Sequence, residues 1–144
     1  MALREVPVSS LSPQKYSQLQ AATIVPRMYI YIEGYELDPK QDAIVYDIEI
    51  GIQKQQVVKV INVKRRYSAL QAFDATVRPL FSDSRFLQRF PPKKVFGNKK
   101  EAFLKDRAEK LQRYLTNLVR VSGIVQAPAF LRCFDIDADW LSDV

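Results

Sequence analysis

The spacing of apolar residues changes near residue 67, and this change limits the fold classes that the chain can adopt. Residues 43–53 read AIVYDIEIGIQ, in which every second position from Ile44 to Ile52 is apolar. That alternation is typical of a β-strand with one face against a core. From Ser68 onward, apolar residues recur at intervals of three and four, the spacing of one helical face. Strands followed by helices predict an α+β domain.

Two further segments are predicted to pair with this strand. Residues 28–37 are rich in aromatic and β-branched side chains and end at Asp38-Pro39. Residues 56–66 continue the alternation after a link of only a few residues, which favours a tight hairpin with residues 43–53. The three segments together predict a three-stranded antiparallel β-meander.

Helices are expected after the meander, over residues 68–78, 99–120 and 127–134. Ser68 is expected to cap the first of them, and Pro79 to end or bend it. Arg107 lies on the shoulder of the apolar stripe of the longest helix, so its side chain is predicted to border the core. That stripe consists of Leu104, Ala108, Leu111, Leu115 and Leu118.

Positive charge is concentrated in residues 64–120. This stretch holds 15 of the 22 Lys and Arg residues but five of the 16 acidic residues, so its net charge is +10 against +6 for the whole chain. A charge this localised attracts anions. Membranes and nucleic acids are both partners of this kind. Nucleic acid is the less favoured, because the aromatic residues fall mostly on core stripes rather than among the lysines and arginines.

The sequence offers little support for enzyme or metal chemistry. There is no histidine, which removes the commonest general base and the commonest zinc ligand. The four glycines are too scattered for a phosphate-binding loop. Cys133 is the single cysteine and cannot form an internal disulfide, which favours an intracellular setting. We therefore expect a binding module without catalytic residues, metal or cofactor.

Three motifs follow one another from Arg65 onward. They are R-R-Y-S at residues 65–68, F-P-P-K-K-V-F-G-N at residues 90–98, and F-L-K-D-R-x-x-x-L-x-x-Y-L at residues 103–115. Together with the meander, their order and spacing resemble the phox-homology (PX) domain. The resemblance implies a meander packed against a helical subdomain, with a basic pocket between them. It also implies a cytoplasmic module, like those of sorting nexins, that binds phosphoinositides, most often phosphatidylinositol 3-phosphate, at endosomal membranes.

The resemblance places the domain at residues 26–137. Residues 1–25 are then expected to form a loosely held N-terminal arm, in which Ser12 and Pro13 favour a short helix. Residues 138–144 are expected to form an acidic tail.

The resemblance also implies a phosphoinositide site. Arg66 would pair with the 3-phosphate, and Tyr67 would stack beneath the inositol ring. Ser68 would add a hydrogen bond to the phosphate. Lys93 would contact the 1-phosphate, and Arg107 would bind the 4- and 5-hydroxyls. The physical chemistry agrees, because the fork of donors on arginine matches a phosphate, whereas lysine supplies a point charge.

Other residues carry less specific expectations. Val95 and Phe96 are candidates for insertion into the bilayer or for packing within their own loop. Gln88 stands where many PX domains have proline, so an SH3-binding role is not implied, and Leu70 stands where they usually have phenylalanine. Candidates for a second anionic contact are Arg65, Lys94, Lys99 and Lys100. A PX fold used mainly for protein contacts is the alternative to a lipid-binding module.

Overall fold

The computed structural model describes residues 3–93 and 99–141 of the chain. Within these ranges the strands are β1 (Arg4–Pro7), β2 (Met28–Asp38), β3 (Ala43–Lys54) and β4 (Val57–Arg66). They form one antiparallel sheet in the order β1-β4-β3-β2. The α-helices are α1 (Pro13–Ala21), α2 (Tyr67–Val77), α3 (Glu101–Leu118) and α4 (Pro128–Cys133). Short 3₁₀ turns occupy Val8–Ser10, Arg78–Phe81, Ile124–Gln126 and Ala138–Trp140.

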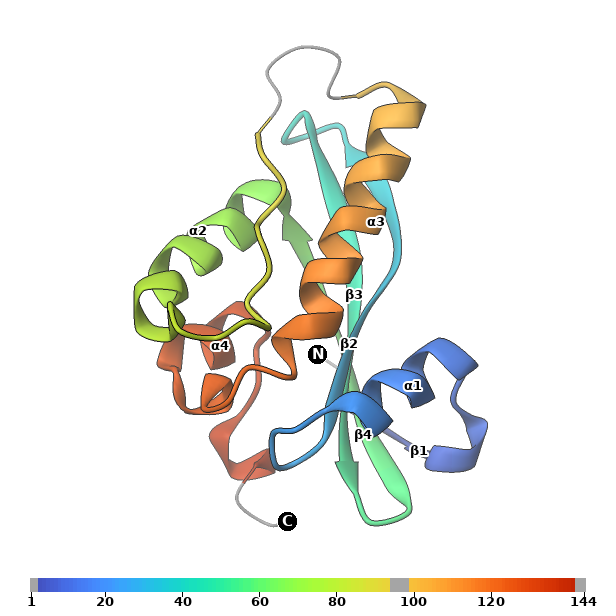
Figure 1. The fold of residues 1–144 in the computed structure, drawn as a ribbon. Coiled ribbons are helices and arrows are strands. Elements are labelled where there is room, and N and C mark those ends of the chain that lie inside the picture. The colour runs from blue at the N-terminus through green and yellow to red at the C-terminus, as the bar shows by residue number, and fades with distance from the viewer. Residues whose placement is uncertain (1–2, 94–98, 142–144) are drawn as a thin grey trace.

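The sheet separates two apolar clusters, and α1 lies on the opposite side of it from α2 and α4 (Figure 1). The larger cluster joins β3, through Tyr46 and Ile48, to residues of α2, α3 and α4. The smaller cluster lies under α1, where Leu19 packs with Tyr29 and Val58. The alternation along the strands therefore serves two cores, one on each face.

The predicted meander and the helices after it are present, and the α+β class is confirmed. The three predicted strands agree with β2, β3 and β4 to within one residue at each end. Pro79 lies in the 3₁₀ turn that follows α2, as expected. The prediction that Ser68 caps α2 is wrong, because β4 passes directly into the helix. Arg66 is therefore the residue before α2, and Ser68 lies in its first turn.

The N-terminal segment is packed onto the sheet, which corrects the expectation of a loosely held arm and adds one strand to the predicted three. β1 pairs with β4 along its whole length, with Arg4 opposite Val60. α1 begins as its sequence predicts, since the Ser12 side chain accepts a hydrogen bond from the backbone N–H of Lys15 at 3.4 Å. The strand REVP was not predicted because it is too short to show alternation and ends in proline.

A buried charge cluster fastens this segment to the sheet. The Glu49 carboxylate accepts hydrogen bonds from the Tyr29 hydroxyl at 2.6 Å and from Arg4 Nη2 at 3.2 Å. Lys15 Nζ lies 2.8 Å from Glu49 and 2.6 Å from Glu33. Burial by itself would raise the pKa of Glu49, but the hydrogen bonds from Lys15 and Tyr29 outweigh it, and the pKa is lowered. Glu49 is therefore an ionised, buried anchor.

Gly51 makes this cluster possible. A Cβ atom at residue 51 would lie 2.1 Å from Cε2 of the Tyr29 ring, far inside contact distance. Tyr29 is fully buried directly opposite Gly51 in the β2–β3 register. The absence of a side chain at Gly51 therefore lets the Tyr29 ring cross β3 and brings its hydroxyl to Glu49.

Candidate functional site

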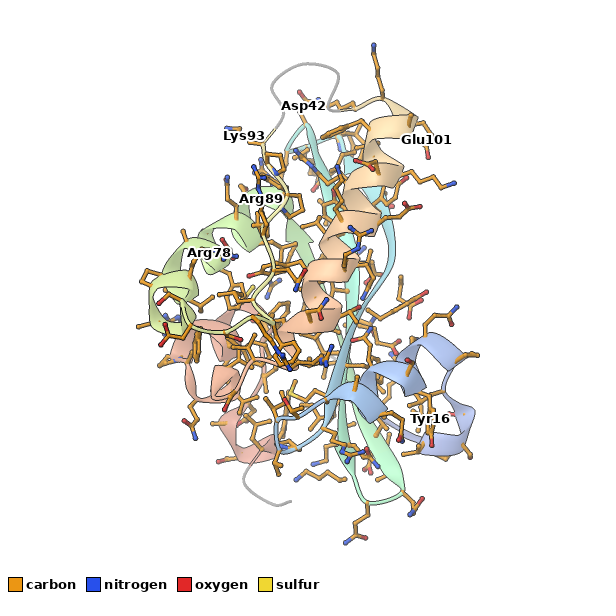
Figure 2. The ribbon with its side chains drawn as sticks, viewed as in Figure 1. Tyr16, Asp42, Arg78, Arg89, Lys93 and Glu101 are labelled. Carbon is orange, nitrogen blue, oxygen red and sulfur yellow. The ribbon has the colours of Figure 1, made fainter. Side chains whose placement is uncertain are left out.

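A cavity of about 200 Å³ opens at one end of the sheet. There the turn between β2 and β3 and the junction of β4 with α2 come together with Lys93 and α3. Figure 2 shows Asp42 and Lys93 at this end of the molecule, near Glu101 at the start of α3. The cavity is lined by Asp42, Ala43, Ile44, Tyr46, Arg66, Tyr67, Ser68, Lys93, Lys99, Leu104 and Arg107. The five residues that the family resemblance implies for a phosphoinositide site all belong to this lining.

The junction of β4 with α2 supplies one wall. Arg66 is exposed, and its Nη1 donates to the Gln41 side-chain oxygen at a long 3.5 Å, so the guanidinium is weakly held. Ser68 follows in the first turn of α2. The first N–H groups of a helix have no partner within it, and the helix dipole favours an anion there. This wall therefore combines a guanidinium, a hydroxyl and a helix N-terminus.

Arg107 forms a more rigid part of the lining. It comes from α3 and is buried, with 8% of its surface exposed. Its guanidinium carbon lies 3.9 Å from the centre of the Tyr67 ring and 4.5 Å from that of Phe103. Its Nη2 also donates to the Pro92 carbonyl at 3.2 Å. Two aromatic contacts and a hydrogen bond fix the guanidinium before any ligand arrives.

Tyr67 links the first turn of α2 to the proline segment. Its hydroxyl donates to the Pro91 carbonyl at 2.5 Å, and its ring packs at a tilt against Phe90 with the centroids 5.4 Å apart. Burial raises the pKa of Tyr67, although Arg107 acts in the opposite direction, so the hydroxyl stays protonated and donates. Together with the bond from Arg107 to Pro92, these contacts hold the chain just before Lys93, whose side chain is exposed at the cavity.

Comparison with known proteins agrees with this architecture. Residues 53–136, more than half of the chain, match the model of the PX domain family. The chain belongs to the PX domain family. PX domains are in general phosphoinositide-binding modules, which associate peripherally with membranes and are typically not catalytic.

Two solved structures resemble this PX domain in fold. One is a designed CISK-PX domain, which is 18% identical, with a TM-score of 0.61 and coverage of 73% of this chain and 96% of that one. The other is the mouse SNX19 PX domain with a bound sulphate ion, which is 16% identical, with a TM-score of 0.57 and coverage of 76% of this chain and 97% of that one. The likeness is therefore one of fold, and it extends over almost all of each solved domain and about three quarters of this chain.

The candidates for a second anionic contact do not gather at one place. Arg65 donates from Nε to the Cys133 carbonyl at 2.7 Å and pairs with Asp135 at 3.0 Å, which directs it to the end of α4. Lys99 lines the cavity, and Lys100 is exposed just before α3. Lys94 and the membrane-insertion candidates, Val95 and Phe96, lie outside the described residues.

The two residues that depart from the family pattern have different surroundings in the structure. Leu70 is buried in the main core. The smaller leucine therefore fills a core position where PX domains usually have phenylalanine. Gln88 contributes its backbone, since its carbonyl accepts a hydrogen bond from Arg78 Nη2 at 2.6 Å.

Among the described residues of this PX domain, no helix is long and apolar enough to cross a bilayer.

Sequence reasoning missed two polar residues of the cavity. Tyr46 lies in its wall and is 1% exposed, and burial raises its pKa to about 12 against the opposing effect of Arg107. The β-strand alternation did place Tyr46 on the core-facing side of β3. Asp42 lies at the mouth, and no motif or periodicity singles it out, because it belongs to the turn before β3.

Proposed function

We propose that this PX domain binds phosphatidylinositol 3-phosphate and thereby associates with endosomal membranes. The observation that carries the proposal is that Arg66, Tyr67, Ser68, Lys93 and Arg107, which come from separate parts of the sequence, line one cavity. At about 200 Å³ that cavity is smaller than the roughly 300–1,000 Å³ of drug-sized pockets, which suits one inositol ring and leaves the acyl chains in the bilayer.

The 3-phosphate is assigned to the wall formed by Arg66 and Ser68. A guanidinium can donate two parallel hydrogen bonds to a phosphate. The N-terminus of α2 adds backbone N–H donors and a partial positive charge, which also favour an anion. Among the described residues, Arg66 is held by the long 3.5 Å contact to Gln41, so it is available to a ligand at little cost. These features support Arg66 as the residue that selects the 3-phosphate.

The 1-phosphate and the ring hydroxyls are assigned to the remaining residues. Lys93 is exposed at the mouth, where the phosphate that joins the inositol to the lipid would lie. Arg107 is buried and held in one orientation, as a group that reads hydroxyl positions must be. Tyr67 supplies an aromatic surface beside the inositol ring. The Arg107 guanidinium lies against one face of the Tyr67 ring, so the two side chains act as a unit.

Replacing Arg107 with lysine tests this assignment. Lysine keeps the charge but loses the planar fork, and we expect about tenfold weaker binding to phosphatidylcholine vesicles that contain phosphatidylinositol 3-phosphate. Vesicle co-sedimentation of wild type and variant measures the change. Arg113→Lys is the matched control, because Arg113 is an exposed arginine of the same helix outside the cavity.

The control is expected to bind like the wild type. Equal binding by Arg107→Lys and wild type would contradict the role of Arg107, since a point charge would then be sufficient. Failure of the wild type itself to bind these vesicles would contradict the proposed function.

A further inference from the structure

The charges that line the cavity are not all of one sign. Among the described lining residues, four carry positive charge: Arg66, Lys93, Lys99 and Arg107. Asp42 is the carboxylate among the described lining residues, and it lies at the mouth of a cavity whose other charges favour an anion. A carboxylate in this position opposes anion binding unless a cation compensates it.

Lys99 provides that compensation. Its Nζ lies 2.6 Å from Asp42 Oδ1, and the pair joins the β2–β3 turn to the residues just before α3. Both side chains are substantially exposed, at 44% for Lys99 and 81% for Asp42. An ion pair this exposed adds little to stability, so its main consequence is to neutralise one of the four cations.

The turn that carries Asp42 is itself held in shape. Asp38 accepts hydrogen bonds from the backbone N–H of Lys40 at 2.9 Å and from the Gln41 side chain at 2.8 Å. Gln41 in turn accepts the contact from Arg66. Asp42 has a φ of 49°, in the left-handed region that aspartate and asparagine tolerate better than most residues. The carboxylate is therefore placed at the mouth by an ordered turn.

The remaining cations then set the number of phosphates that the cavity can bind. Arg107 is committed to Tyr67, Phe103 and Pro92, and Lys99 is neutralised by Asp42. Of the described lining residues, Arg66 and Lys93 are left, one for a ring phosphate and one for the 1-phosphate. A second ring phosphate would have to draw Lys99 away from Asp42. The phosphate and the Asp42 carboxylate would then lie close together without a cation for each.

We propose that Asp42, through its ion pair with Lys99, restricts the cavity to an inositol head group with a single ring phosphate. This inference rests on the proposed function. It adds that Asp42 is a determinant of specificity, which disfavours bisphosphorylated lipids without contacting the favoured one.

The test compares phosphatidylcholine vesicles containing phosphatidylinositol 3-phosphate with vesicles containing the 3,4- or the 3,5-bisphosphate. Wild type is expected to bind the monophosphate at least as tightly as either bisphosphate. In Asp42→Asn, Lys99 is released, and the affinity for at least one bisphosphate relative to the monophosphate should rise about tenfold through one new charge-assisted hydrogen bond. Asparagine suits the positive φ at this position, so the turn is expected to fold.

Two further variants separate this effect from a general change of charge. Asp42→Asn combined with Lys99→Met should return the ratio of affinities to the wild-type value, because no cation is left to bind the added phosphate. Asp106→Asn removes a carboxylate from a comparable Asp–Lys pair on α3, outside the cavity, where Asp106 lies 2.9 Å from Lys110. That control should leave the ratio unchanged.

Several results would overturn the inference while leaving the proposed function intact. They are a wild type that prefers a bisphosphate, an unchanged ratio in Asp42→Asn, a raised ratio that persists in the double variant, and loss of binding to every lipid in Asp42→Asn. In contrast, a wild type that binds none of the three lipids would refute the proposed function itself.

Discussion

Replacing Glu49 with glutamine is expected to lower the free energy of unfolding by about 3 kcal/mol, because the change removes one partner of a buried ion pair. The side chain of Glu49 is 9% exposed and receives Lys15, Arg4 and the Tyr29 hydroxyl. Glutamine keeps the shape and one acceptor oxygen but removes the negative charge that Lys15 and Arg4 share. Lys15 retains Glu33, which limits the loss. Urea unfolding followed by circular dichroism measures the difference.

Glu36→Gln is the matched control for this change. Glu36 lies on β2 and pairs with Lys64 at 3.3 Å, but both side chains are largely exposed. A surface pair of this kind contributes at most about 1 kcal/mol. A Glu49→Gln variant no less stable than Glu36→Gln would contradict the account of how β1 and α1 are held.

The pH dependence gives the same prediction a second test. The pKa of Glu49 is lowered from its ordinary value of 4.5, so its contribution to stability is fully present above that value and is lost as pH falls through the folded-state pKa. The difference between wild type and Glu49→Gln should therefore be constant near neutral pH and shrink below about pH 4.5. A difference that stays constant down to strongly acid pH would show that the charge is not the cause.

Replacing Arg66 with glutamine is expected to reduce the affinity for vesicles containing phosphatidylinositol 3-phosphate by about ten- to 150-fold. This range corresponds to the roughly 1.5–3 kcal/mol carried by a hydrogen bond to a charged group. Arg66 is exposed, and within the described part of the chain its side chain makes one long contact, to Gln41, so thermal unfolding should barely change. Loss of binding with an unchanged melting temperature would identify Arg66 as a ligand rather than a structural residue.

Arg113→Gln controls for the general loss of positive charge. It removes the same charge from the basic stretch of residues 64–120, at an exposed position that does not line the cavity. Its effect on vesicle binding should be about the 1 kcal/mol typical of one basic residue near an anionic surface, or less. If Arg66→Gln and Arg113→Gln weakened binding equally, the affinity would come from the charged surface and not from the cavity.

The regular elements could be predicted from the sequence because each carries its own periodic pattern. β3 alternates along its length since one face is buried in the main core, and α3 repeats Leu111, Leu115 and Leu118 for the same reason. The position of β1 could not be predicted in this way. Its four residues are held by pairing with β4 and by the contact of Arg4 with Glu49, which are tertiary interactions without a local signature.

The candidate site was partly predictable for a related reason. Arg66, Tyr67 and Arg107 stand within motifs, and the family resemblance placed them together before their positions in space were known. Asp42 stands in no motif, and its partner Lys99 is 57 residues away, so the pair emerges only when the chain is folded. The stacking of Arg107 on Tyr67 is likewise a contact between two helices, although the helical stripe did predict that Arg107 borders the core.

The most direct test of the central claim is a titration of the wild-type domain against phosphatidylcholine vesicles containing phosphatidylinositol or its 3-, 4- or 5-monophosphate. It is repeated at about 0.1 M and at about 1 M salt, where the screening length falls from about 10 Å to about 3 Å. The account predicts tightest binding to the 3-phosphate, with that preference retained at the higher salt. Equal binding to all three monophosphates, lost together at high salt, would contradict it.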